Sequence, residues 1–130
     1  MLSAIVGTWL FTGMLISGEW TPPMNPNLVM KFEFYEDGVN RLSYFRKDEP
    51  GFCDRKALYD YDGEMLYQQV SWVSKENESR CYEDPDMQMG SETRTRVSLQ
   101  GSQIFMEVQV GDESITYIWD KKIDNEGEIK

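Results

Sequence analysis

The sequence predicts an all-β chain that folds as an eight-stranded antiparallel up-and-down β-barrel. Apolar and polar residues alternate with a period of two along most of the chain, and Asp37-Gly38 and Asp62-Gly63 are typical of tight hairpin turns. A Gly-x-Trp motif, Gly7-Thr8-Trp9, opens the first alternating stretch, and no amphipathic helix of useful length is present. Successive hairpins favour a meander, and eight strands close well, which removes the exposed edges of an open sheet.

The first strand is expected over residues 5–16. A loop over 17–27 follows, because its three prolines each remove a backbone hydrogen-bond donor that a central strand needs. The second and third strands, 28–36 and 39–46, flank the turn at Asp37-Gly38. Their alternation places one set of apolar residues on a common face: Met30, Phe32, Phe34, Leu42 and Tyr44.

The fourth and fifth strands are expected over 53–61 and 65–74, with Arg55, Ala57, Tyr59 and Tyr61 on one face of the fourth. Residues 75–90 are polar and acidic and predict a long loop, which at such a length is usually functional or mobile. Three further strands follow, over 92–100, 103–110 and 114–121, and residues 121–130 form a loose tail. With no repeat and no internal linker, residues 1–130 are predicted to form one domain.

Over about residues 4–122 the chain resembles the lipocalins and their bacterial lipocalin-like relatives, within the wider calycin group. The matching features are Gly7-Thr8-Trp9 on the first strand, the long first loop and the run of hairpins after it. The resemblance implies that Trp9 packs across the closed end of the barrel. It also implies that a basic residue after the last strand covers this ring, and Lys121 and Lys122 stand where that residue would be.

Charge and cysteine content narrow the function classes. The formal charge of -10 repels phosphate backbones and anionic membrane surfaces, so nucleic acid is not expected as a partner. No apolar run reaches the roughly 18 residues that a transmembrane helix needs. Cys53 and Cys81 both lie near predicted loops, which favours one disulfide and an oxidising compartment over two free thiols. We therefore expect a periplasmic or secreted protein whose signal peptide has been removed.

A barrel interior lined by apolar side chains with few polar groups suits a small hydrophobic molecule. The first loop would add either a lid at the open mouth or an anchor for a partner. The alternative is a barrel that its own side chains fill, acting as a protein-interaction or inhibitor module through its loops. The residues predicted to contact a ligand are Trp20, Met24, Phe32, Phe34, Tyr44, Tyr59, Gln68, Met106 and Tyr117.

Chemistry at this interior is not expected. The chain has no histidine, so a general base at neutral pH would need a strongly shifted carboxylate or lysine. We predict no catalytic residue, no metal site and no cofactor. The acidic run 83–86 lacks the spacing of a calcium loop, and we interpret it as solvated. Arg55, Arg94 and Arg96 would bind an anion if one of them faced inward, but we interpret them as surface charges.

Overall fold

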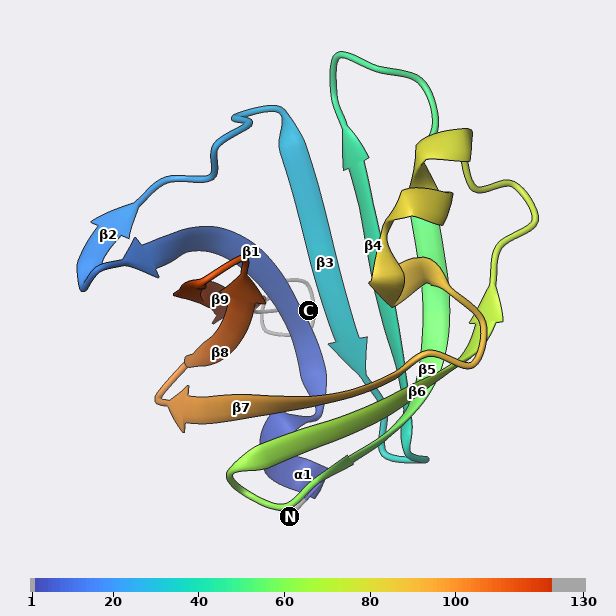
Figure 1. The fold of residues 1–130 in the computed structure, drawn as a ribbon. Coiled ribbons are helices and arrows are strands. Elements are labelled where there is room, and N and C mark those ends of the chain that lie inside the picture. Colours follow the sequence, from blue (N-terminus) through green and yellow to red (C-terminus); the bar gives the residue numbers. More distant parts are fainter. Residues whose placement is uncertain (1, 123–130) are drawn as a thin grey trace, which may run out of the picture.

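Within residues 2–122 every strand belongs to one antiparallel sheet, and two strands far apart in the sequence close it. The computed structural model describes residues 2–122, and within this part of the chain the sheet order is β2-β1-β3-β4-β5-β6-β7-β8-β9, with β1 also paired to β9. Strands β1 and β3–β9 therefore close the predicted eight-stranded barrel (Figure 1). The strands are β1 Gly7–Ile16, β2 Glu19–Thr21, β3 Leu28–Phe34, β4 Val39–Arg46, β5 Cys53–Tyr61, β6 Met65–Val73, β7 Glu92–Gln100, β8 Gln103–Val110 and β9 Glu113–Lys121.

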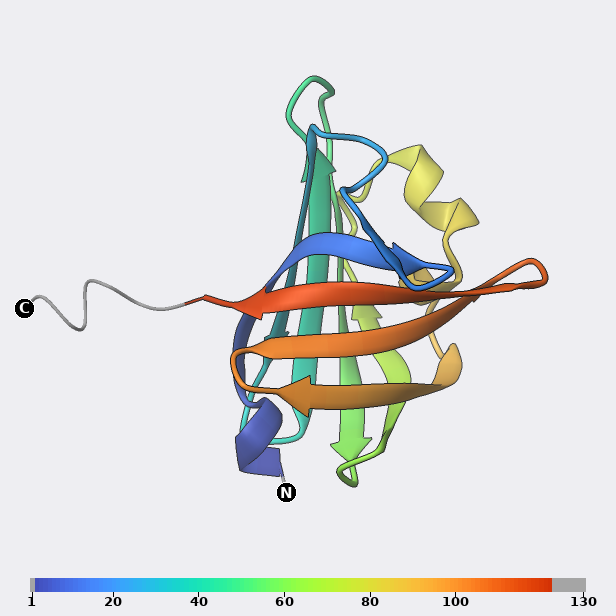
Figure 2. The same ribbon diagram turned by 90° about the vertical axis from the view of Figure 1, so that its left-hand side faces the viewer.

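The barrel is flattened into two groups of strands that cross. Strands β3–β6 run along one direction, and β7, β8 and β9 run across them, with β1 curving from one group to the other (Figure 2). This crossing brings Phe32 of β3 against Trp119 of β9, with the ring centroids 5.3 Å apart. The core is one cluster of buried apolar side chains inside the closed sheet, as the alternation predicts.

Four short elements depart from the predicted strand pattern. Residues Leu2–Ile5 form a helical turn, α1, and β1 begins only at Gly7, whose φ of +141° is one that residues with a Cβ rarely adopt. The first loop contains β2, which pairs with the end of β1. Two 3₁₀ turns, η1 Ser79–Glu83 and η2 Pro85–Met87, lie in the segment predicted as a plain loop. The expected tail lies outside the described residues from 123 onward, and Lys121 still belongs to β9.

Trp9 seals one end of the barrel, as the resemblance implies. Its ring is buried and its Nε1 donates a hydrogen bond to the carbonyl of Ile5 in α1 over 2.9 Å. The Lys121 Nζ lies 5.5 Å from the centre of the ring, so Lys121 is the basic residue that covers it. A Cβ at Gly7 would approach Lys121 Cε to 2.9 Å, and the glycine therefore leaves room for this cover.

The wall of the barrel has an opening between β7 and β8. These two strands pair only where Val97–Gln100 meets Gln103–Met106. The earlier part of β7 continues to pair with β6, and the later part of β8 continues to pair with β9. Residues 92–96 and 107–110 thus diverge, and members of both segments line a gap that reaches Phe32 and Arg55 in the interior.

Candidate functional site

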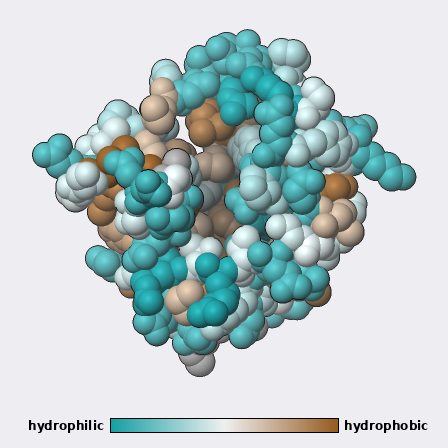
Figure 3. All heavy atoms as spheres, in the orientation of Figure 1, coloured by the Kyte–Doolittle hydropathy of each residue, from teal (hydrophilic) through white to brown (hydrophobic). Residues whose placement is uncertain are grey.

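The barrel interior contains an apolar cavity of about 300 Å³, on the side away from Trp9. Strands β3, β4, β8 and β9 supply its walls, because alternate residues of each strand face inward. Phe32 and Trp119 lie at its inner end, and Figure 3 shows apolar residues within the hollow near the centre of the molecule. The residues that line this cavity are Leu28, Met30, Phe32, Leu42, Tyr44, Arg46, Asp84, Asp86, Met106, Val108, Tyr117 and Trp119.

A second, more polar cavity of about 520 Å³ lies behind the gap between β7 and β8. Thr93 and Thr95 of β7 line it, together with Gln68 of β6 and Arg55 of β5. Four residues, Phe32, Asp86, Met106 and Val108, line both cavities. The two spaces are therefore neighbours that share a wall, and together they offer apolar surface at one end and hydrogen-bonding groups at the other.

The polar cavity is organised by Arg55, which is only 1% exposed. Its Nη1 donates to Asn40 Oδ1 over 2.6 Å, its Nη2 to Gln68 Oε1 over 3.2 Å, and its Nε to the backbone carbonyl of Asp86 over 3.1 Å. Asn40 Nδ2 also donates to Gln68 Oε1 over 2.7 Å. Burial lowers the pKa of Arg55 to about 10, although Asp86 and Asp84 oppose that shift.

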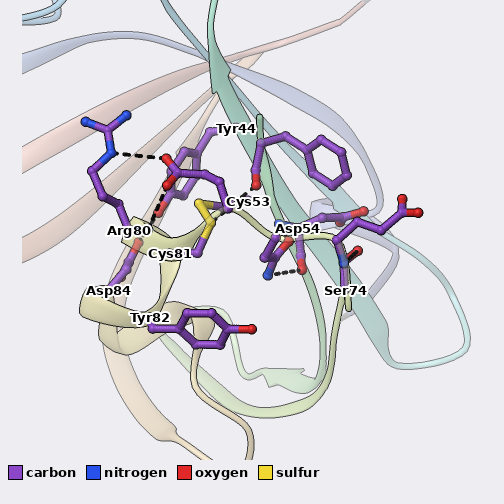
Figure 4. The surroundings of a disulfide bond; sticks show 12 residues. Tyr44, Cys53, Asp54, Ser74, Arg80, Cys81, Tyr82 and Asp84 are labelled. Carbon is purple, nitrogen blue, oxygen red and sulfur yellow. Dashed lines mark hydrogen bonds and ion pairs between the residues drawn. A yellow bond between two sulfur atoms is a disulfide. The ribbon is translucent and has the colours of Figure 1, made fainter. Parts of the chain in front are cut away.

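The disulfide predicted between Cys53 and Cys81 is present, and its Cα atoms are 5.6 Å apart. It joins η1 to the start of β5 (Figure 4). The acidic segment that follows, residues 83–86, reaches the cavities through Asp84 and Asp86. Tyr44 donates a hydrogen bond from its hydroxyl to Asp84 Oδ2 over 2.5 Å.

The pKa shifts of this region follow from burial. Burial first, and then the hydrogen bond to Asp84, raises the pKa of Tyr44. Burial and the neighbouring Asp84 raise the pKa of Asp86, whereas Arg55 lowers it. The sequence predicts that residues 83–86 are solvated, and this prediction is wrong for Asp86. Its side chain lines both cavities, because the disulfide holds the segment against the barrel.

The structure brings together five of the nine residues predicted to contact a ligand. Phe32, Tyr44, Met106 and Tyr117 line the apolar cavity, and Gln68 lines the polar one. The other four, Phe34, Tyr59, Trp20 and Met24, line neither cavity.

Each of these four has a different setting. Phe34 and Tyr59 pack against one another in the core, with ring centroids 5.0 Å apart, and the Tyr59 hydroxyl donates to the carbonyl of Tyr35. Trp20 of β2 pairs with Leu15 of β1, and its ring lies against Gly13 with 59% of the side chain exposed. Met24 is exposed. Neither Trp20 nor Met24 of the first loop therefore lines the two cavities.

Sequence reasoning placed Arg55 at the surface, and the structure corrects this. The available signal was its position on the same alternating face as Ala57, Tyr59 and Tyr61, all of which are buried. Asn40, Thr93 and Trp119 were not singled out. The Trp119 Nε1 is buried, and no acceptor for it lies within residues 2–122.

Within residues 2–122, no helix is both long and apolar enough to cross a membrane. The same residues contain no group of three or more His, Cys, Asp or Glu side chains that could hold a metal ion.

Comparison with known proteins identifies relatives in fold. No protein-family model matches the chain, and no curated protein matches it. A lipocalin-like protein from Bacteroides uniformis aligns over 92% of this chain and 99% of its own, with a TM-score of 0.62 and 15% identity. An uncharacterized protein from Bacteroides eggerthii aligns over 90% and 98%, with a TM-score of 0.52 and 12% identity.

A mutant of the fluorescent protein UnaG aligns over 95% of this chain and 100% of its own, with a TM-score of 0.50 and 13% identity. Sequence identities as low as these establish the fold alone. The chain therefore has a lipocalin-like fold, as the Gly-x-Trp motif and the hairpin pattern predict.

Proposed function

We propose that this protein binds and carries a small, largely hydrophobic molecule inside its barrel and performs no chemistry on it. The observation that carries this proposal is the pair of adjacent cavities, about 300 and 520 Å³ in volume, that open into the interior of one closed sheet. Ligand pockets of small molecules are typically of this size and combine apolar walls with a few polar groups. Each Å² of apolar ligand surface removed from water would contribute about 25 cal/mol to binding.

The disulfide supports a function in an oxidising compartment, either a periplasm or the exterior of the cell, because such bonds persist there and are rare in the cytosol. The alternative function, an interaction module with a filled barrel, requires a solid interior. The two cavities favour ligand binding over the interaction module. The observation that favours a protein partner is Trp20, whose side chain is 59% exposed. Native mass spectrometry of protein purified from its own host tests the proposal directly, since a carrier retains a bound small molecule.

A larger side chain in the wall that the two cavities share is expected to weaken ligand binding. Met106→Trp replaces a buried, flexible side chain that lines both cavities with a larger, rigid ring. We expect the affinity for a fluorescent fatty acid to fall at least tenfold, or about 1.4 kcal/mol. Titration of the probe by fluorescence measures the change.

The matched control is Phe105→Trp. Phe105 directly precedes Met106 in β8, and alternation turns its side chain to the other face of the sheet. This variant should bind the probe as the wild type does. Equal losses in the two variants would place the probe outside the barrel. No binding by the wild type across a panel of lipids and pigments would leave the interaction module as the better proposal.

A further inference from the structure

Trp119 of β9 carries a buried hydrogen-bond donor that has no acceptor within residues 2–122. Its side chain is only 2% exposed, and an indole N–H can donate but not accept. Trp9 is equally buried, yet its Nε1 donates to the carbonyl of Ile5 over 2.9 Å. Buried polar groups almost always have a partner, and an exception indicates a group that comes from outside the chain. The N–H of Trp119 is therefore ready to receive an acceptor.

The surroundings of Trp119 indicate where that acceptor comes from. Its ring lies between those of Phe11 and Phe32, with centroid distances of 5.5 and 5.3 Å, and neither of these side chains has a polar atom. Its strand neighbours on either side, Phe11 of β1 and Ile104 of β8, are apolar as well. Trp119 also lines the apolar cavity of about 300 Å³, at the inner end beside Phe32. An acceptor would thus approach from this cavity.

The charges around the cavity do not favour an anion at this end. Asp84, Asp86 and Arg46 line the apolar cavity, and Arg55 lines the polar cavity beside it. The two carboxylates and the two guanidinium groups balance one another in number. Burial first, and then the two carboxylates, raise the pKa of the hydroxyl of Tyr117, two residues before the tryptophan. A buried anion would lose its hydration there without a spare counter-charge, whereas an uncharged oxygen loses less.

We propose that the ligand carries an uncharged hydrogen-bond acceptor, a carbonyl oxygen on an apolar body, that accepts from Trp119 Nε1 at the inner end of the apolar cavity. This inference rests on the proposed function and adds the chemical class of the ligand. The N–H of Trp119 is already desolvated by the fold, so the bond to the ligand restores a partner that the chain does not supply.

The first test uses three molecules with the same heptyl chain: 2-nonanone, 2-methyl-1-nonene and octanoate. In the alkene, a CH₂ group replaces the ketone oxygen, so the two molecules differ only in the acceptor. Displacement of a fluorescent lipid probe measures each affinity at neutral pH. Trp119→Phe removes the donor and keeps an aromatic ring. We expect the ratio of the ketone affinity to the alkene affinity to fall about tenfold in this variant.

Trp72→Phe is the matched control, because it makes the same substitution at a ring that is 41% exposed and lines neither cavity. Its ratio should equal that of the wild type. The wild type should also bind the ketone more tightly than octanoate. An unchanged ratio in Trp119→Phe, or tighter binding of octanoate, would overturn the proposal.

The second test needs only the wild type and therefore stands even if Trp119→Phe does not fold. The chain has four tryptophans, so its ¹H–¹⁵N spectrum has four indole signals. Addition of 2-nonanone should move the proton signal of Trp119 downfield, as a new hydrogen bond does, and the alkene should not. The signal of Trp9 is the internal control, because its N–H already has an acceptor. Equal effects of the two molecules on the Trp119 signal would refute the bond.

Failure of this inference differs from failure of the proposed function. If the ketone and the alkene both bind and Trp119 responds to neither, the acceptor site is refuted and the cavity remains a binding site. If the wild type binds none of the three molecules and no other lipid, the proposed function itself falls.

Discussion

Trp9→Ala is expected to lower the free energy of unfolding by about 3–5 kcal/mol, the usual cost of truncating a large buried aromatic residue. Trp9 is 1% exposed, and its ring fills the closed end of the barrel. Three interactions end together in this variant: packing in the core, the hydrogen bond to Ile5 and the contact with Lys121. Because single domains are only marginally stable, such a loss is a large share of the total.

Urea denaturation followed by circular dichroism measures the effect. Trp72→Ala is the matched control, since it removes the same ring from the outer face of β6, where Trp72 is 41% exposed. That variant should lose no more than about 1 kcal/mol, as surface substitutions usually do. Similar losses at both positions would show that Trp9 does not close the barrel.

The fold was predictable because the sequence patterns that determine its strands and turns lie within short stretches of the chain. Period-two alternation and two-residue turns determine which stretches form strands, and the observed strands lie within about two residues of the predicted ones. The exceptions depend on contacts between distant parts of the chain. Strand β2 has three residues and exists only through its pairing with β1, and α1 is held by the hydrogen bond between Trp9 and Ile5. Neither leaves a periodic signal in the sequence.

The site was predictable only in part. Apolar residues on inward faces identify Phe32, Met106 and Tyr117 as cavity residues, because alternation and hydrophobicity agree at those positions. At Arg55 they disagree: alternation places it inside, whereas its charge is typical of the surface. The structure follows the alternation, since Asn40 and Gln68, from the neighbouring strands, supply acceptors. Those partners are known only once the strand register is known.

Removing the disulfide is expected to cost about 3–4 kcal/mol of unfolding free energy in the chain-entropy description of cross-links. The bond between Cys53 and Cys81 closes a loop of 28 residues that contains β5 and β6, and the acidic segment follows directly after Cys81. The double variant Cys53→Ala/Cys81→Ala removes the cross-link without leaving reactive thiols. Urea denaturation of the variant and of the wild type, each with and without a reducing agent, measures the cost.

The loss of stability in the double variant should be uneven along the chain. Without the cross-link, the turns η1 and η2 are held by noncovalent contacts alone, among them the Tyr44–Asp84 hydrogen bond, the bond from Arg55 to the carbonyl of Asp86 and the burial of Met87. The barrel strands keep the backbone hydrogen bonds between them. Amide hydrogen exchange in the variant should therefore accelerate at 78–90 far more than in β3 or β9. Reducing agent should destabilise the wild type and leave the double variant unchanged. A variant as stable as the wild type, with unchanged exchange at 78–90, would mean that the acidic segment stays over the cavities without the cross-link.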